Sequence, residues 1–462
     1  MDTKALRQKI LDLAIHGKLV PQDPNDEPAS VLLERIRAEK ERLIKEGKIK
    51  KGKKSAKTSD KPHYPFELPK GWCFTNIGEL LINRDGERKP VSSAIRSKQL
   101  NKIYDYYGAA GVIDKIDDYL FDEKLLLIGE DGANLLSKSK NNAFFAEGKY
   151  WVNNHAHVLD ATDKNLLEYV AIVINAIKLD DYITGSAQPK LSQDNLNKIP
   201  IVLPPLSEQK RIMEAIIHWS LLIEQIEQNK IDLQASIKQA KSKVLDLAIH
   251  GKLVQQDPND EPASELLKRI NPKAETITDN GHYQKLPEGW TICKLKDICS
   301  KLVDGDHNPP KGTKETTEYL MLSAQNIVND NIVYTNGVRY LNHDTFETSD
   351  KRTKVMQGDL LITIVGTLGR SCVFSDNKKI TLQRSVACLT PLIYNHFLKY
   401  YMDSSSIQKY MTTNAKGTAQ KGFYLNQLEQ LPIMIPPLTE QQRIVARIEK
   451  IFARLDVIES AL

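Results

Sequence analysis

Two histidines separated by one residue are the most suggestive candidates for metal chemistry in this chain of 462 residues. On an extended strand, His155 and His157 project from one face, as the imidazole ligands of a zinc site would. A similar stretch later in the chain, Ser385-Val386-Ala387, carries no ligand, and no cysteine or carboxylate is obviously supplied. We therefore favour a structural or hydrogen-bonding role for the pair and predict no metal site.

Other motifs that could carry catalysis are weak. The chain has no GxxxxGK[ST] phosphate loop, which excludes the common nucleotide motors. Asn308-Pro309-Pro310-Lys311 is similar to the Asn-Pro-Pro-aromatic motif of amino-methyltransferases, but lysine replaces the aromatic ring that stacks on a flipped base. We interpret this segment as a turn, and the acidic pairs at 122–123 and 130–131 as surface turns. We predict no catalytic residue.

Several loops combine glutamine, asparagine, lysine, arginine and glycine, the residue types that contact base edges and phosphates. Two of them share the pattern Gly-[Ser/Thr]-Ala-Gln and then diverge, at 185–188 and 417–420. The matching glutamines could read an adenine edge, or they could simply hold the loop. The candidate DNA contacts are Gln188, Lys190, His307, Lys311, Arg370, Gln420 and Lys421.

These loops belong to a chain that repeats itself. The segments 11–30 and 245–264 are identical at every position except Pro21, which is Gln255 in the second copy. The segments LPKGW and LPEGW (68–72 and 286–290) and PPLSEQ and PPLTEQ (204–209 and 436–441) follow in the same order. The blocks between them are much less alike. A long repeat of this kind predicts that one surface is presented twice and that the two copies support two different domains.

The repeated 20-residue segment is therefore the candidate docking surface for two copies of one partner. Its candidate contacts are Leu13, His16 and Lys18 in the first copy and Leu247, His250 and Lys252 in the second.

A long helix should connect the two halves. Apolar residues recur at alternating steps of four and three from Ile212 to Leu247, which is a heptad seam for helix packing. Ser207 can cap its start and Gly251 its end. The same register continues from Ile444 to Leu462 and is completed by Leu6, Ile10 and Leu13, with Thr439 and Gln442 forming a capping box. The repeat is therefore cyclic, and we expect the two chain ends to meet.

Composition sets further limits. The net charge is only +5, so charge alone does not establish a nucleic-acid partner. The five cysteines lack CxxC spacing, no signal peptide is recognised, and the longest apolar stretch, 169–179, is too short to span a bilayer. A cytoplasmic location is expected. The lysine-rich run 45–61 is interpreted as a solvated tether.

The fold class that we predict is mixed α/β: two globular α/β domains separated by two long antiparallel coiled-coil helices, in a cyclic pseudo-two-fold repeat. Buried strands are expected at 125–128 and 359–365, and helices at 166–182 and 395–412. The predicted parts are an N-terminal support helix with a basic linker (1–62), a first recognition domain (63–206), a central long helix and linker (207–281), a second recognition domain (282–438) and a C-terminal support helix (439–462).

The motifs together resemble the specificity subunit of Type I restriction–modification systems, over nearly the whole chain. The resemblance rests on the repeated 11–29 segment, the two LPxGW entries, LIGEDGAN (127–134), WVNNHAHVL (151–159), DGDHNPPK (304–311) and the two PPL[ST]EQ segments.

This resemblance implies two target-recognition domains, each reading half of a split asymmetric site in double-stranded DNA. It implies two modification (methyltransferase) subunits on the supports and two restriction (translocase/nuclease) subunits outside them. S-adenosylmethionine, ATP and Mg²⁺ would sit in those partners, with no cofactor in this chain. The alternatives are a self-contained methyltransferase or nuclease with an unrecognised active site, and a protein scaffold that binds no nucleic acid.

Overall fold

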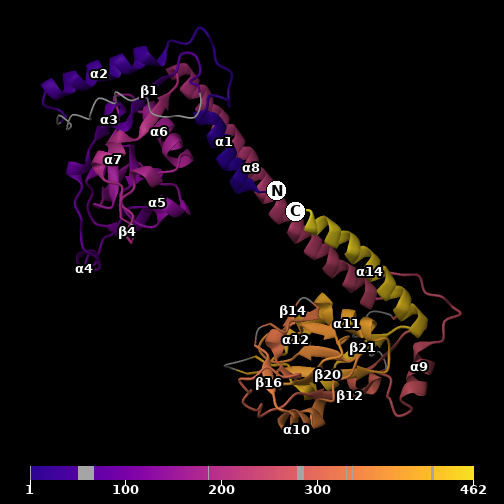
Figure 1. Ribbon diagram of the computed structural model, residues 1–462. Helices are drawn as coiled ribbons and strands as arrows, with labels where there is room; N and C mark the ends of the chain where they lie inside the picture. The colour runs from indigo at the N-terminus through magenta and orange to yellow at the C-terminus, as the bar shows by residue number, and fades with distance from the viewer. Residues whose placement is uncertain are drawn as a thin grey trace. The chain divides into compact units, whose positions relative to one another are not determined.

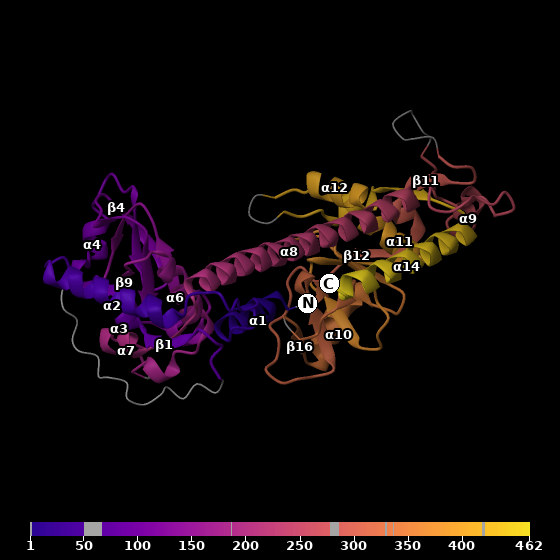
Figure 2. The ribbon, with the colours of Figure 1, turned by 90° about the horizontal axis from the view of Figure 1, so that it is seen from above.

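The structure is a computed structural model that describes residues 2–49, 67–185, 187–277, 286–328, 330–335, 337–417 and 421–462. The chain divides into two compact units, Met1–Asn229 and Lys230–Leu462. One uninterrupted helix, α8 (Leu206–Ile249), belongs to both units (Figure 1, Figure 2). The predicted central helix is therefore confirmed almost to the residue.

The first unit carries a head of two four-stranded sheets, ordered β2-β9-β6-β7 and β4-β3-β8-β5, and a separate pair β1-β10 that closes its base. Helix α6 packs on β6 and β7. The strands are β1 Cys73–Asn76, β2 Ile82–Asn83, β3 Tyr104–Gly108, β4 Gly111–Ile116, β5 Phe121–Asp122, β6 Leu125–Gly129, β7 Ala143–Ala146, β8 Lys149–Val152, β9 Ala156–Asp160 and β10 Pro200–Leu203; the helices besides α8 are α1 Thr3–Ile15, α2 Ala29–Lys45, α3 Ile77–Leu80, α4 Ser93–Arg96, α5 Asn134–Ser137, α6 Asn165–Ala176 and α7 Gln193–Lys198.

The second unit repeats this plan with sheets ordered β12-β20-β17-β18 and β16-β13-β19, a small pair β14-β15 and a closing pair β11-β21. The strands are β11 Thr291–Lys294, β12 Cys299–Asp304, β13 Tyr319–Leu322, β14 Ile327–Val328, β15 Asn331–Ile332, β16 Arg339–Leu341, β17 Leu360–Thr363, β18 Ser371–Val373, β19 Lys379–Leu382, β20 Val386–Pro391 and β21 Pro432–Ile435; the helices are α9 Ala263–Ile270, α10 His343–Thr353, α11 Asn395–Asp403, α12 Ser405–Thr413, α13 Leu425–Glu429 and α14 Leu438–Ser460. The mixed α/β character is thus confirmed in both units.

Two predicted helices are shorter than expected. Helix α6 ends at Ala176, and only a 3₁₀ turn at Asp180–Tyr182 follows it. The expected helix 395–412 is split into α11 and α12 at Ser404, whose backbone is extended and whose buried hydroxyl donates to the carbonyl of Tyr401. A serine can satisfy the last carbonyls of a helix locally, and the chain then starts a new helix in another direction.

Each unit pairs part of α8 with a second helix that runs antiparallel to it. In the first unit Arg7 of α1 reaches Glu227 at 3.1 Å, while Gln22, beyond the end of α1, reaches Glu208 at the start of α8. In the second unit Lys241 of α8 contacts Glu459 of α14 at 2.8 Å. The two ion pairs are equivalent in the repeat. Whether the chain ends meet concerns both units at once, and it stays a prediction.

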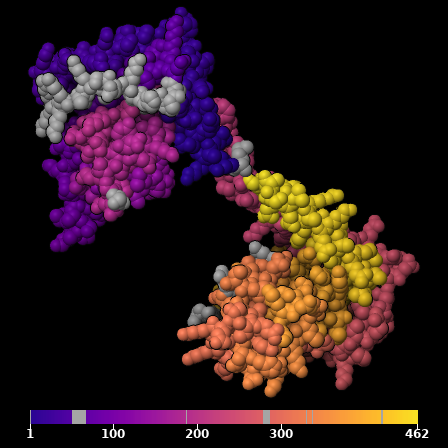
Figure 3. All heavy atoms as spheres, viewed as in Figure 1, coloured from indigo at the N-terminus to yellow at the C-terminus, as the bar shows by residue number. Residues whose placement is uncertain are grey.

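The heptad seam is only partly buried. Ile212, Ile223 and Ile237 are at most 4% exposed, whereas Trp219 and Leu233 keep 43% and 40% of their surface exposed. Along α14 the exposure rises toward the C-terminus, where Val457 is 69% exposed, and Figure 3 shows the open outer surface of this helix. A second helix therefore covers only one side of the seam, and apolar surface is left for a further partner.

The predicted helix caps are wrong in detail. Helix α8 begins at Leu206 and α14 at Leu438, so Ser207 and Thr439 lie inside the first turn. The residue before α14, Pro437, has no side-chain cap. The hydroxyl of Thr439 instead bonds the Asp260 carboxylate. The predicted stop at Gly251 is confirmed, because Gly251 has a φ of +63° and Lys252 N donates to Leu247 O, as in a Schellman ending.

The repeated segments meet at one point in each unit, which we call the hub. In the first hub Trp72 Nε1 donates to Glu208 Oε2 at 2.8 Å, and Gln22 Nε2 donates to Glu208 Oε1 at 3.0 Å. Arg211 closes it through a 2.6 Å ion pair with Asp26. The second hub repeats every one of these contacts, with Trp290 and Gln256 on Glu440 and Arg443 on Asp260. Much of the repeated sequence therefore serves internal contacts.

The hub also explains the glycines of the repeat. Gly17 has a φ of +64°, and a Cβ added there would stand 2.5 Å from Pro69 Cγ and 3.2 Å from the ring of Trp72. Gly251 has a φ of +63°, and its added Cβ would stand 2.4 Å from Pro287 Cγ. Both backbone geometry and close packing therefore require glycine.

Candidate functional site

The two heads share one backbone frame beside the ends of β6 and β17. In the first head Lys190 forms isolated bridges with Asp131 and Thr184; in the second, Gly422 does so with Val365 and Lys416. Leu191 N donates to Glu130 O at 2.7 Å, and Phe423 N donates to Ile364 O at 2.8 Å. The residues that flank the Gly-[Ser/Thr]-Ala-Gln segments are therefore held at equivalent places. In this frame Lys190 corresponds to Gly422, so Lys190 and Lys421 do not occupy equivalent positions.

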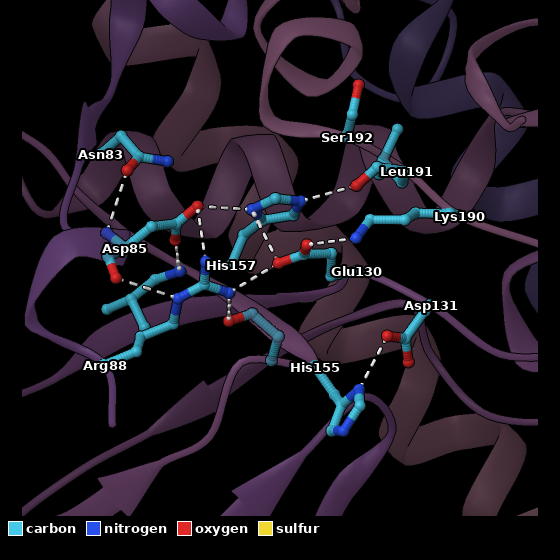
Figure 4. Close-up of polar contacts among 12 residues, drawn as sticks. Asn83, Asp85, Arg88, Glu130, Asp131, His155, His157, Lys190, Leu191 and Ser192 are labelled. Carbon is cyan, nitrogen blue, oxygen red and sulfur yellow. Dashed lines mark hydrogen bonds and ion pairs between the residues drawn. The ribbon is translucent and has the colours of Figure 1, made fainter. Parts of the chain in front are cut away.

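The first head fills this frame with charged side chains (Figure 4). His157 of β9 is 1% exposed and lies 2.6 Å from the Asp85 carboxylate. Arg88 binds Glu130 at 2.7 Å and Asp85 at 3.3 Å, and Lys190 binds the other oxygen of Glu130 at 3.3 Å. Burial would raise the pKa of Asp85, but hydrogen bonding by His157 and the nearby cations outweigh burial and hold that pKa below its ordinary value.

The ring of His157 has an oxygen atom opposite each of its nitrogens. Nδ1 faces the ionised Asp85 carboxylate at 2.6 Å, and Nε2 faces the carbonyl oxygen of Leu191 at 2.8 Å. The imidazole is therefore held from both sides, by a side chain and by a backbone carbonyl. Asp85, Glu130 and His157 bring their ligand atoms within 4.8 Å of one another. A metal ion bound to these atoms would compete with Arg88 and Lys190, which already hold the two carboxylates in an ion-pair network.

The two histidines that the sequence placed together have separate partners. His155 lies 2.7 Å from Asp131 and is half exposed, whereas His157 is buried against Asp85 (Figure 4). The hydrogen-bonding role favoured from the sequence is what the structure shows for both imidazoles.

The second head builds the same frame from different side chains. In the second head the strand register places Asp304 opposite Ala387. In the first head Asn83 lies opposite Leu159, and the same register carried two residues further sets Asp85 against His157. Asp304 therefore corresponds to Asp85. His307 binds Asp304 at 2.7 Å, in the place where Arg88 approaches Asp85. The positions that hold Glu130, Asp131 and His157 in the first head hold Ile364, Val365 and Ala387 here. One frame therefore presents two different chemical surfaces.

One turn occurs in both heads at positions that these strand registers align, and this correspondence was not recognised from the sequence. Asp85-Gly86-Glu87-Arg88-Lys89-Pro90 matches Asp304-Gly305-Asp306-His307-Asn308-Pro309 in the order aspartate, glycine, acid, base, any residue, proline. The spacing from the LPxGW segments would have revealed it, although only the second copy was recognised. The segment 308–311 lies outside the helices and strands, in agreement with the turn interpretation, and Asn308 N donates to Asp306 Oδ1 at 2.8 Å.

The predicted contact residues lie mainly on exposed loops of the two heads. Lys190 is engaged by Glu130 and His307 by Asp304, and Arg370 reaches the carbonyl of Ile327 at 3.4 Å. Gln420 lies outside the described residues. The solvent-exposed members of the set are Gln188, Lys190, His307, Lys311, Arg370 and Lys421.

The predicted partner contacts have the same degree of exposure in the two repeats. Leu13 and Leu247 are half-buried, and Lys18 and Lys252 are exposed. The Nδ1 atoms of His16 and His250 each lie 2.6 Å from the carbonyl four residues earlier, at Asp12 and Asp246. The exposed turns beyond the hubs also match; they comprise Asp23, Pro24, Asn25, Glu27 and Pro28 and their copies Asp257, Pro258, Asn259, Glu261 and Pro262.

Comparison with protein families decides what these heads are. The family described as "Type I restriction modification DNA specificity domain" matches this chain twice, at residues 69–237 and 287–461. The chain belongs to this family. DNA sequence recognition is the role of the family, and the two matches each cover one head and the helix that follows it. The expectation drawn from the repeated motifs is therefore confirmed.

Relatives within the family cover most of the chain. The Type I restriction enzyme EcoEI specificity subunit of Escherichia coli is 27% identical over 542 residues, spanning 99% of this chain and 90% of that protein. The EcoAI specificity subunit of the same species is 32% identical over 376 residues, 64% of this chain and 62% of that protein. The HsdS subunit of Thermoanaerobacter tengcongensis superposes with a TM-score of 0.49 and 16% identity, covering 86% of this chain and 93% of that one.

The cysteines and the helices add two plain findings. All five cysteines are unpaired, and burial raises the pKa of the Cys293 and Cys372 thiols to about 12. Across the described residues, no helix is both long and apolar enough to cross a bilayer.

Proposed function

We propose that each head of this specificity subunit reads one half of a split, asymmetric site in double-stranded DNA. The observation that carries the proposal is the shared frame with exchanged chemistry: Glu130, Asp131 and His157 in one head stand where Ile364, Val365 and Ala387 stand in the other. Equal frames with unequal side chains suit two different half-sites, because base edges are discriminated by the donors and acceptors that they meet.

The supports suit the docking of two identical subunits. The hubs agree contact for contact, and the exposed turns beyond them agree in sequence, so a partner that fits one copy fits the other. Partly exposed seam residues such as Trp219 and Leu233 give a helix of the partner an apolar surface to cover. We assign these surfaces to two modification (methyltransferase) subunits, with two restriction subunits bound outside them.

In this assembly the chain itself is non-catalytic and works in the cytoplasm. S-adenosylmethionine, ATP and Mg²⁺ belong to the partner subunits. The helices α1, α8 and α14 act as a spacer between the two recognition events. Purified chain incubated with labelled S-adenosylmethionine and DNA should transfer no label, and the complete complex should transfer it; transfer by the chain alone would overturn the assignment.

The decisive experiment is a map of methylated adenines across the genome with and without the chain. We expect a split asymmetric motif that disappears when the chain is removed. Replacing residues 63–206 by the corresponding head of another family member should then change one half of the motif only. A change in both halves, or in neither, would contradict the assignment of one head to one half-site.

The stoichiometry is tested separately by native mass spectrometry of the chain with its modification subunit. Two partners per chain are expected. Lys18→Glu and Lys252→Glu, made singly and together, should weaken binding at one and at both positions respectively. A saturated complex with a single partner would contradict the role of the repeat.

A further inference from the structure

The second head contains a polar cleft next to the shared frame. The cleft has a volume of about 520 Å³ and lies between the aspartate–glycine turn, the 3₁₀ turn before β14, the loop after β17 and the turn before β20. Its polar lining includes His307, Gln325, Thr367, Gln383, Arg384 and Ser385. Because amides, hydroxyls, an imidazole and a guanidinium dominate this lining, the cleft suits hydrogen-bonding ligands and not an apolar molecule.

The backbone that carries Arg384 is fixed on both sides. Arg384 N donates to Asp306 O at 2.9 Å, and Gln383 N donates to Leu322 O at 2.8 Å. Ser385 holds the neighbouring 3₁₀ turn through a 3.1 Å hydrogen bond from Ala324 N. The side chain of Arg384 therefore projects from a rigid support, which is what a precise contact requires.

The guanidinium of Arg384 is free in the described part of the chain. The residue is exposed, and its side chain forms neither an ion pair nor a hydrogen bond with any residue that the structure describes. Three other basic groups near the frame are ion-paired: Arg352 binds Asp304, and in the first head Arg88 and Lys190 bind Glu130. The guanidinium of Arg384 therefore offers adjacent N–H donors, at the rim of a polar cleft, that have no acceptor among the described residues.

The first head has no equivalent group. The register that pairs Gly129 with Ala156 corresponds to the one that pairs Thr363 with Val386, so Arg384 corresponds to Asn154. The two heads thus differ at this position by a full charge and by the planar fork of donors that only arginine offers.

We propose that Arg384 is a specificity-determining residue, which reads a guanine in the half-site recognised by the second head. The inference rests on the proposed function, in which that head reads a half-site. Guanine offers two acceptors, O6 and N7, on its major-groove edge, and the two outer nitrogens of a guanidinium match them with parallel hydrogen bonds. A contact of this kind favours guanine over other bases by roughly 5- to 150-fold.

The test uses the complete modification complex. Genome-wide methylation maps and binding to a panel of duplexes, each with one base of the second half-site changed, are compared for wild type, Arg384→Ala and Arg384→Lys. We expect Arg384→Ala to accept any base at one former guanine of the second half-site, to lose at least about 5-fold in preference there, and to leave the first half-site unchanged. Arg384→Lys should lose most of this preference, because an ammonium cannot form the two parallel bonds.

Matched variants exclude general effects. Asn154→Ala, at the corresponding position of the first head, should leave the second half-site untouched. Lys296→Ala removes an exposed charge near the opposite end of β12 from Asp304 and should leave the motif unchanged. Arg384→Met, which keeps an unbranched aliphatic stem but carries no donor, takes the place of the alanine variant if that one fails to assemble.

Two results would overturn the proposal. In the first, the motif of Arg384→Ala is unchanged and binding weakens equally for all duplexes, which would make the residue a phosphate contact. In the second, the second half-site contains no G·C pair. Both differ from failure of the proposed function, in which the wild-type complex would methylate no split motif.

Discussion

The indole Nε1 of Trp72 donates a hydrogen bond of 2.8 Å to the carboxylate of Glu208, and Trp290 repeats this contact with Glu440 at 3.1 Å. Each pair joins the entry of a head to the helix that follows it. Glu208 and Glu440 are at most 1% exposed, so each carboxylate depends on its few partners for the hydrogen bonds that water would otherwise supply.

Removing the indole donor should therefore destabilise the unit that contains it. Trp72→Phe should lower the free energy of unfolding by about 1–3 kcal/mol, because a buried carboxylate loses a partner. Trp290→Phe should do the same in the second unit, as followed by urea denaturation. Trp151→Phe is the control, since Trp151 donates to the carbonyl of Lys89 on an exposed surface; an equal loss in all three variants would contradict the role of the hub.

The hub glycines give a second prediction, which separates backbone strain from steric overlap. Gly17→Ala and Gly251→Ala suffer both, because the added Cβ would stand within 2.5 Å of a proline Cγ. Gly47→Ala suffers strain alone: its φ is +70°, and nothing lies within 4 Å. We expect Gly47→Ala to cost about 1 kcal/mol and the hub variants distinctly more, measured by thermal denaturation. Equal costs would mean that Pro69 and Pro287 move aside.

Acid should weaken the hub through Asp26 and Asp260. Hydrogen bonds from Arg211 and Arg443 lower the pKa of these carboxyl groups in spite of burial. A depressed folded-state pKa contributes stability above the unfolded value, near pH 4, and that stability is lost as the pH falls through the folded-state value. Asp26→Asn should therefore be less stable than wild type by about 1 kcal/mol at pH 7, and the difference should shrink below pH 4.

The control for this pH dependence is Asp344→Asn. Asp344 has a fully exposed side chain, so its substitution should leave stability unchanged at both pH values. A difference for Asp26→Asn that persists at pH 3 would show that the side-chain shape, and not the charge, stabilises the hub.

The cyclic repeat predicts that a circular permutant folds. Leu462 would be joined to Met1 by a short linker, and the chain would be opened between Asn271 and Gly281. Because α1 and α14 both pair antiparallel with α8, the permutant should keep its α-helical content and bind the modification subunit. A permutant opened inside β6 serves as the disruptive control. Loss of partner binding by the first permutant alone would contradict the cyclic arrangement.

The sequence predicted the fold class and α8 because periodicity and repetition are local signals. The heptad steps from Ile212 to Leu247 set the helix, and Gly251 ended it. It also predicted that the repeated segment has a common purpose. The contribution of that segment to the fold was hidden, because its contacts join residues that are distant in sequence: Gln22 meets Glu208 across 186 positions and Asp26 meets Arg211 across 185.

The site was predicted less well for the same physical reason. Lys190 looked like a free cation, but Glu130, sixty residues earlier, neutralises it. Thr439 looked like a helix cap, yet Asp260 takes its hydroxyl. Arg384 went unnoticed, since no local pattern marks it and only the folded turn leaves its guanidinium without a partner. Pairings between distant residues decide which side chains are available, and composition carries no record of them.

The hubs also bring together the two points at which each head joins the rest of the chain. The first head leaves the support at Trp72 and returns at Glu208, and a hydrogen bond joins these two points. Its ends coincide, as in a surface loop whose length can change at little entropic cost. Segments added to or lost from the head between these points need not displace the support. A head inserted in this way can change in size and outline while the hub and the paired helices keep their positions.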